Sequence, residues 1–210
     1  MGNFIVFEGC EGSGKSTQAR LLYNRLLEKG YPGLLTHEPG GTSFGESIRR
    51  TLRKGDHINP STWLFLFSAA RTQLLDEIVR PALISGQTVV CDRYFPSTVS
   101  YQGYGYGLDL DMIYTITEIA TQGLRSDIVV LLDSPPSLGV NRRKGQRRDR
   151  FETEPIDFHE RVREGYLKQA KDDPERWLVL DATLRKEEIA EAVWGKVQLL
   201  LGNIQANPIV

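Results

Sequence analysis

Cysteine is scarce in this sequence, long apolar runs are missing, and neither sign of charge dominates. The two cysteines, Cys10 and Cys91, are too few for a disulfide framework or a cysteine-rich zinc site, and this usage suits a reducing cytoplasm. No run approaches the roughly 18 apolar residues of a membrane span. The N-terminus has neither the charged region nor the apolar stretch of a signal peptide. These absences predict a cytoplasmic protein with no membrane partner.

A broad basic surface is also missing. The chain has 26 basic and 27 acidic residues, which give a formal net charge of −1 at pH 7. Proteins that bind nucleic acid generally present a wide positive field. We therefore expect no nucleic-acid partner, and any basic site must be local.

The remaining composition is that of an ordinary globular protein. Of its 210 residues, 40% are hydrophobic and 25% are charged. Five short apolar runs are each followed by a stretch of helical periodicity, which predicts a parallel five-stranded sheet with helices on both faces. We expect one α/β domain over residues 1–210. The predicted strands are 3–7, 34–37, 88–92, 128–133 and 178–181, and the predicted helices are 15–29, 45–53, 61–84, 95–101, 109–122, 155–171 and 185–201, with one more after Pro135.

Local signals refine two of these helical regions. Ser61, which follows Pro60, is expected to cap the helix 61–84, and Pro81 is expected to bend its last turn. The glycine-rich stretch 103–107 is expected to form a loop.

The segment Gly-Cys-Glu-Gly-Ser-Gly-Lys-Ser at 9–16 matches the phosphate-binding pattern G-x-x-x-x-G-K-[ST] at every position. It follows a predicted strand and opens a predicted helix, so its backbone amides can point at a phosphate. Lys15 would reach the β- and γ-phosphates, and Ser16 would offer a hydroxyl to Mg²⁺. The alternative, a glycine-rich helix cap, requires neither the Lys-Ser pair nor its register. The predicted nucleotide-binding residues are Gly9, Cys10, Glu11, Gly12, Ser13, Gly14, Lys15, Ser16 and Thr17.

A phosphate loop predicts a nucleoside triphosphate but not the reaction. A GTPase would show an Asn-Lys-x-Asp string, which is absent. The small chain, with polar residues at its strand ends, favours a kinase acting on a small molecule. A kinase for another nucleotide or a nucleoside, and a switch NTPase acting on a macromolecular partner, remain alternatives.

Two further pairs of residues suit such a kinase. Asp92 and Arg93 close the third predicted strand, where an acid can hold Mg²⁺ and an arginine can grip a phosphate with two hydrogen bonds. The alternative is a surface ion pair. Phe67 and Arg71 are four residues apart and share a helix face, which allows a ring to stack on a base and a guanidinium to read it. The alternative is a core phenylalanine with a surface arginine one turn away.

Residues 142–150 hold six basic side chains and one acidic side chain. Phosphoryl transfer needs cations around the moving group and exclusion of water, which favours a lid over about 141–153 that closes on the nucleotide. The alternatives are a nucleic-acid patch, which the net charge of −1 argues against, and a solvated helix face.

Six segments occur in a fixed order along the chain: Phe-Glu-Gly-x-Glu-Gly-x-Gly-Lys-Ser-Thr (7–17), Glu-Pro-Gly-Gly-Thr (38–42), Phe-x-x-x-Arg (67–71), Asp-Arg-Tyr (92–94), Ser-Thr-x-x-Tyr-Gln-Gly (97–103) and Asp-Arg (149–150). Taken together, they resemble the bacterial thymidylate kinases, a P-loop family of nucleoside monophosphate kinases. The resemblance covers roughly residues 3 to 195. The phosphate loop is common to many families, whereas the segments at 38–42 and 92–103 are more specific.

This resemblance implies transfer of a phosphoryl group from ATP to dTMP with Mg²⁺, in a homodimer whose substrates are small molecules. It implies that Arg49 and Arg93 hold the dTMP phosphate and that Phe67 and Arg71 bind thymine. It also implies that Tyr101 stands where a 2′-hydroxyl would clash. The substrate-binding residues that it implies are Glu11, Glu38, Phe44, Arg49, Phe67, Arg71, Arg93, Ser97, Thr98, Tyr101 and Gln102, and the metal-binding residues are Ser16 and Asp92.

Members of this family place their catalytic cation either in the phosphate loop or in the lid. Glu11 occupies the loop and arginines occupy 142–150, so this chain resembles the second type. His37 departs from the family, which often has arginine at this position. The catalytic residues implied are Lys15, Arg93, Arg142, Arg147 and Arg150.

Overall fold

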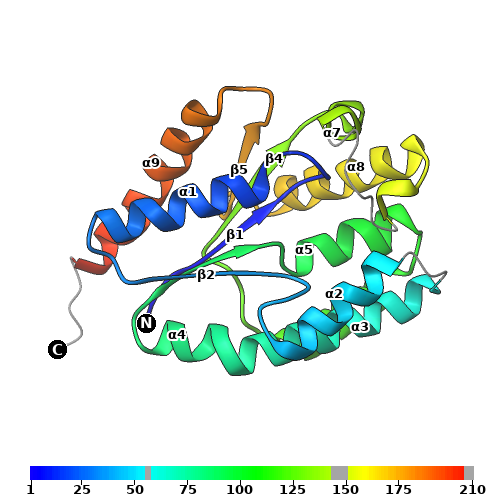
Figure 1. The fold of residues 1–210 in the computed structure, drawn as a ribbon, viewed down its shortest axis with the longest axis horizontal. Helices are drawn as coiled ribbons and strands as arrows, with labels where there is room; N and C mark the ends of the chain where they lie inside the picture. Colours follow the sequence, from blue (N-terminus) through cyan, green and yellow to red (C-terminus); the bar gives the residue numbers. More distant parts are fainter. Residues whose placement is uncertain (55–57, 143–150, 206–210) are drawn as a thin grey trace.

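The computed structural model describes residues 1–54, 58–142 and 151–205, and it confirms the expected α/β class (Figure 1). Within these residues, five strands form one parallel sheet in the order β2-β3-β1-β4-β5. Every predicted strand is present and lies within one residue of its expected bounds. The strands are β1 (Phe4–Glu8), β2 (Gly33–His37), β3 (Thr88–Asp92), β4 (Ile128–Asp133) and β5 (Trp177–Asp181).

Helical segments connect the strands, as the alternating pattern predicts. The α-helices are α1 (Lys15–Glu28), α2 (Ser43–Lys54), α3 (Pro60–Leu74), α4 (Arg80–Ile84), α5 (Phe95–Thr98), α6 (Leu110–Thr121), α7 (Pro136–Arg142), α8 (Ile156–Asp172) and α9 (Lys186–Gln205). Two π-helical segments, η1 (Leu75–Val79) and η2 (Val99–Gly105), and one 3₁₀ turn, η3 (Phe151–Thr153), complete them.

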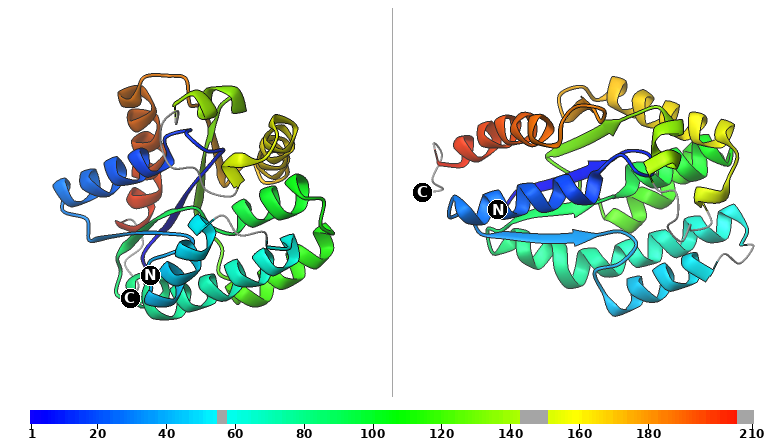
Figure 2. Two further views of the ribbon diagram at one scale, coloured as in Figure 1. Left: turned by 45° about the vertical axis from the view of Figure 1, so that its right-hand side comes forward. Right: turned by 45° about the horizontal axis from the view of Figure 1, so that its top comes forward.

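Helices cover both faces of the sheet because alternate side chains of a buried strand point to opposite faces. On β1, Ile5 and Phe7 pack into the core formed with α1 and α9. Phe4 and Val6 pack into the opposite core, which includes residues of α3, η1 and α4. Figure 2 shows α1 and α9 together on one side of the sheet and α8 on the other.

The predicted helix 61–84 consists of α3, η1 and α4 in succession. It begins one residue earlier than expected, and the predicted cap at Ser61 is wrong. The side chain of Asn59 accepts a hydrogen bond from the backbone N–H of Ser61 at 2.8 Å. Pro60 is the first residue of α3. A backbone N–H at this position has no partner within the helix, so proline, which lacks this N–H, loses no hydrogen bond here.

The loop expected at 103–107 is also wrong for residues 103–105, since they belong to η2. Both glycines serve close packing. A Cβ atom on Gly103 would lie 2.5 Å from the Leu110 side chain, and one on Gly105 would lie 2.6 Å from the Phe158 ring. Gly103 and Gly105 therefore reflect tight contacts with α6 and α8, whereas Gly107, with φ at 76° and no atom of the described residues within 4 Å of an added Cβ, follows the end of η2.

The strand order places one edge of the sheet at a topological switch point. From β1 the chain crosses to β2 and β3 on one side and later to β4 and β5 on the other. In open parallel sheets, ligands bind at the carboxyl ends of strands where the order reverses. Phe7 and His37 are both in register with Asp92 at this edge. No helix in the described part of the chain has the length and apolar character of a membrane span.

Candidate functional site

A cavity of about 960 Å³ opens at this edge of the sheet. Its walls come from the loop after β1, from the ends of β2 and β3, and from α1, α2, α3, α5 and η2, and Phe151 of η3 also lines it. It brings together most of the predicted site. The predicted residues that line it are Glu11, Gly12, Gly14, Lys15, Ser16, Thr17, Glu38, Arg49, Phe67, Arg71, Asp92, Arg93, Ser97, Thr98, Tyr101 and Gln102.

The phosphate loop follows β1 directly and leads into α1. Gly9, Gly12 and Gly14 have φ angles of 141°, 71° and 99°, a region that favours glycine. The buried Lys15 ammonium donates a hydrogen bond to the carbonyl oxygen of Cys10 at 2.7 Å. Burial, together with the nearby positive charge of Arg93, lowers the pKa of Lys15. Lys15 is therefore a buried cation of the phosphate loop. No carboxylate in the described part of the chain lies within hydrogen-bond distance of its ammonium group.

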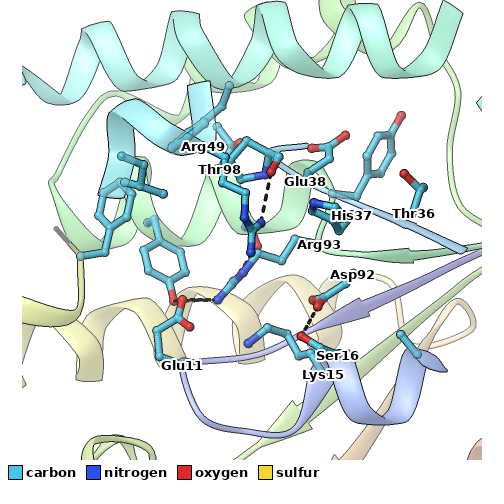
Figure 3. Close-up of a pocket in the computed structure, with 18 of the residues that line it drawn as sticks. Glu11, Lys15, Ser16, Thr36, His37, Glu38, Arg49, Asp92, Arg93 and Thr98 are labelled. Carbon is cyan, nitrogen blue, oxygen red and sulfur yellow. Dashed lines mark hydrogen bonds and ion pairs between the residues drawn. The ribbon is translucent and has the colours of Figure 1, made fainter. Parts of the chain in front are cut away.

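One part of the cavity wall is formed by α1 and the end of β3, which are joined by a hydrogen bond. The Ser16 hydroxyl donates a hydrogen bond to Asp92 Oδ2 (Figure 3). The other oxygen, Asp92 Oδ1, is buried and has no partner in the described part of the chain. This hydroxyl and this carboxylate are the hard oxygen ligands that Mg²⁺ prefers.

Arg93 occupies the centre of the site in a backbone conformation that is unusual for a residue other than glycine, with φ at 75°. Its guanidinium forms an ion pair with Glu11 (Figure 3). It also donates to the hydroxyl oxygens of Ser97 at 2.9 Å and Tyr166 at 3.1 Å. The guanidinium carbon lies 5.2 Å from the centre of the Tyr101 ring. Arg93 is thus held on several sides.

Arg71 lies deeper in the cavity and is 1% exposed. It donates to Glu38 Oε2 and to Thr98 Oγ1, both at 2.9 Å. Two atoms of this buried pair, Arg71 Nη1 and Glu38 Oε1, have no partner among the described residues. Burial raises the pKa of Glu38 to about 7, although the adjacent guanidinium opposes this change.

An aromatic wall stands beside this pair. The Phe67 ring stacks on Trp63 with a centroid distance of 5.3 Å and an interplanar angle of 19°. Phe67 also meets Phe151 at 6.0 Å. Phe67 and Arg71 both line the cavity, so the structure confirms the prediction that they share a helix face. Arg71 is buried and does not lie on the surface.

Three further predicted substrate-binding residues, Arg49, Gln102 and Phe44, differ in their relation to the cavity. Arg49 donates to the carbonyl oxygen of Pro39 at 3.2 Å. The buried Gln102 keeps an Nε2 that no described residue pairs. Phe44 is 43% exposed and does not line the cavity, so it is not brought together with the other predicted substrate-binding residues.

The predicted lid is described only at its ends. Arg142 is the last residue of α7, and Phe151 begins η3 and lines the cavity. Arg147 and Arg150 lie outside the described residues. The lid over 141–153 therefore stays a prediction.

Sequence reasoning does not single out Glu8 or Tyr166, although hydrogen bonds link Arg93 to Tyr166 and Tyr166 to Glu8. Glu8 carries a signal, because a carboxylate ends an otherwise apolar strand one residue before the phosphate loop. Tyr166 has no local signal, since it is one of several buried residues on the amphipathic helix α8.

Comparison with known proteins agrees with this geometry. The sequence profile of the thymidylate kinase family matches residues 7–193. The thymidylate kinase of Dehalococcoides mccartyi strain BAV1 is 46% identical over 204 residues, which cover 96% of this chain and 98% of that protein. The enzyme of Roseiflexus castenholzii is 46% identical over 220 residues, covering 97% and 96%. The crystal structure of thymidylate kinase from Ehrlichia chaffeensis superposes with a TM-score of 0.77 at 31% identity, covering 93% of this chain and 98% of that one. The chain belongs to the thymidylate kinase family.

Proposed function

We propose that this chain phosphorylates dTMP to dTDP, with ATP as the phosphoryl donor and Mg²⁺ as the assisting ion, in the cavity at the carboxyl edge of the sheet. The observation that carries the proposal is the composition of this one cavity. A phosphate loop with a buried lysine stands at one end, and a buried arginine beside an aromatic wall stands at the other. A nucleoside monophosphate needs both an anion site and a ring site.

The donor end is formed by Lys15 and the loop amides, which bind the phosphates of ATP. The acceptor phosphate binds Arg93, with Arg49 nearby on α2. Glu11, which pairs with Arg93, also reaches the sugar of dTMP, and Tyr101 faces the same sugar. The resemblance to the thymidylate kinase family supports this division of roles, as does the ion pair that joins Arg93 to Glu11 in the same cavity.

The base lies between Phe67 and the Arg71 pair. A thymine ring offers carbonyl oxygens and one ring N–H, and Arg71 Nη1, which no described residue pairs, can donate to a carbonyl. Gln102 and Thr98 lie at the same end, and Glu38 holds Arg71 in place. A buried donor that stays unpaired without the correct base is a source of specificity.

Magnesium fits the donor end. Ser16 and the second oxygen of Asp92 would hold it, directly or through water. The described residues contain no group of three or more metal-binding side chains, which suits Mg²⁺ because it usually takes only one or two protein ligands together with phosphates and water. When bound, it neutralises charge on the donor phosphates.

The chemistry requires no covalent intermediate. The acceptor phosphate is already anionic and is a usable nucleophile. The protein has to bring two polyanions together, neutralise them and align them for in-line transfer. Lys15 and Arg93 supply positive charge from within the cavity, and we propose that Arg142, Arg147 and Arg150 add charge from the lid.

A panel of acceptors tests this function. Purified protein with ATP and Mg²⁺ is offered dTMP, dUMP, dCMP, AMP, GMP, thymidine or no acceptor, and ADP release is followed. We expect fast turnover with dTMP and very little without an acceptor. Slower turnover with dUMP is expected, because one methyl group discriminates by only about 10- to 200-fold.

A Lys15→Ala variant serves as the control for the phosphate loop. We expect kcat to fall about 100-fold or more, since a preorganised cation at the transferred group is lost, while the circular dichroism spectrum stays native. ADP release that ignores the acceptor would support a switch NTPase instead. An active Lys15→Ala protein would overturn the assignment of the loop.

We further propose that the chain acts as a homodimer in the cytoplasm. Both cysteines are free thiols, as expected in a reducing compartment. The helices α3 and α6 pack together and expose Phe65 and Ile119, which is the kind of apolar surface that an interface covers.

A further inference from the structure

Glu8 is a fully buried carboxylate that the proposed chemistry does not use. It is the last residue of β1, and its side chain does not line the cavity. Removing an isolated carboxylate from water costs several kcal/mol unless other groups compensate the charge. The hydrogen-bond partners of Glu8 therefore indicate the role of this carboxylate.

Both oxygens of Glu8 accept hydrogen bonds from one small group of residues. Oε1 accepts from the backbone N–H of Tyr94 at 2.8 Å and of Ser97 at 3.3 Å. Oε2 accepts from the hydroxyls of Ser97 at 2.6 Å and Tyr166 at 3.0 Å. Burial raises the pKa of Glu8, whereas the positive charge of Arg93 and these hydrogen bonds lower it.

The two hydroxyls link Glu8 to Arg93. Arg93 Nη1 donates to Ser97 Oγ at 2.9 Å and to Tyr166 Oη at 3.1 Å. A guanidinium can only donate and a carboxylate can only accept. The hydrogen bonds that Arg93 donates and those that Glu8 accepts therefore run in one direction through the two hydroxyls, which also lie 2.8 Å from each other. An amide at position 8 would bring donors of its own and break this order.

The backbone contacts act on the same arginine. Tyr94 follows Arg93, whose φ of 75° is strained for a residue with a side chain. The carboxylate accepts from the backbone N–H of Tyr94, the residue before α5, and from that of Ser97, which also donates to the Tyr94 carbonyl oxygen at 3.1 Å. Glu8 thus fixes the turn that carries Arg93 and the acceptors that orient its guanidinium.

We propose that Glu8 is a positioning residue that holds the Arg93 guanidinium toward the acceptor phosphate through the hydroxyls of Ser97 and Tyr166. This inference rests on the proposed role of Arg93. The other terminal nitrogen of Arg93, Nη2, pairs directly with Glu11 at the cavity. The guanidinium is therefore linked to two carboxylates, to Glu11 directly and to Glu8 through the two hydroxyls.

Steady-state kinetics of Glu8→Gln, which keeps the shape and removes the charge, test this inference. We expect KM for dTMP to rise about 10- to 100-fold, as for the loss of hydrogen bonds that support a charged group, with KM for ATP changed less than about threefold. Tyr166→Phe should raise KM for dTMP in the same direction. In the Tyr166→Phe background, Glu8→Gln should have a smaller effect, because part of the network is already missing.

Val6→Ala is the matched control, since Val6 is fully buried on the same face of β1, two residues from Glu8. It should lower the melting temperature and leave both KM values unchanged. If Glu8→Gln only lowers the melting temperature in the same way, the positioning role is overturned.

Arg93→Gln separates this inference from the one beneath it. A large rise in KM for dTMP in Arg93→Gln without one in Glu8→Gln would refute the role of Glu8 alone. An unchanged KM for dTMP in Arg93→Gln would refute the proposed role of Arg93, and the role of Glu8 with it.

Discussion

Charged side chains around the cavity are buried to a degree that is rare without paired partners. Lys15, Glu38 and Arg71 are all less than 8% exposed. The ion pair between Glu38 and Arg71 compensates part of the cost, but each partner keeps one buried atom that no described residue pairs. Burying an unsatisfied polar atom costs about 1 to 3 kcal/mol. This cost is recovered when a polar ligand supplies the missing partners, so binding and stability are coupled at these residues.

The burial of Glu38 predicts how the stability of the fold depends on pH. Its pKa is about 7 in the folded chain, against an ordinary value of 4.5. Between these values the folded state binds more protons than the unfolded state, so the stability that Glu38 contributes is present in full below about pH 4.5 and is lost as pH rises through 7. Urea unfolding of the wild type and Glu38→Gln at pH 5 and pH 8 checks this. The wild type should lose up to about 3 kcal/mol relative to the variant, and a constant difference would contradict it.

At the scale of elements, α7 lies directly against the phosphate loop. A Cβ atom on Gly139 would lie 2.0 Å from the carbonyl oxygen of Glu11, and one on Gly12 would lie 2.7 Å from the Gly139 carbonyl oxygen. Two backbones can approach this closely only where both residues lack a side chain. The helix that precedes the basic stretch therefore supports the loop that carries Glu11.

We predict that Gly139→Ala lowers kcat/KM about 10-fold or more, because a displacement of the loop by a few tenths of an ångström or more misaligns the reacting groups. Gly195→Ala is the control, since Gly195 lies in α9 and a Cβ atom added there would meet no heavy atom within 4 Å. It should leave kinetics unchanged and stabilise the fold by about 0.5 to 1 kcal/mol. Normal kinetics in Gly139→Ala would show that the contact does not matter for function.

At the scale of the whole molecule, the strand order collects the site from distant parts of the chain. The loop after β1, the ends of β2 and β3, and η2 meet at one edge. The helix α3 lines the cavity with Phe67 and Arg71, and it also packs against α6, with which it forms a surface that carries Phe65 and Ile119. The exposed Phe65 and Ile119 of this surface do not line the cavity.

We predict that sedimentation equilibrium gives a mass twice the 23.7 kDa of one chain. Ile119→Asp should shift the protein toward the monomer, because a charge placed in an apolar interface loses its hydration. Leu199→Asp, at a position of similar exposure on α9, should remain dimeric. A wild-type monomer at all concentrations would refute the proposed dimer.

The sequence by itself determined the strands, the parallel sheet and the phosphate loop. These features depend on local periodicity and on glycines whose spacing allows one backbone path, and both can be read from neighbouring residues. The spacing of Phe67 and Arg71 likewise predicted a shared face. It did not predict the burial of Arg71, which depends on a counter-charge from Glu38, 33 residues away.

Only the tertiary structure decided how Arg93 is held and why Gly103, Gly105 and Gly139 are glycines. Glu8 and Tyr166 are separated by 158 residues and meet only because α8 packs against α5, η2 and β4, the strand next to β1. Such contacts depend on the distance between packed elements and on the direction of each side chain, and local sequence patterns carry neither quantity. The pattern of residues thus located the site, and the packing of the elements set its geometry.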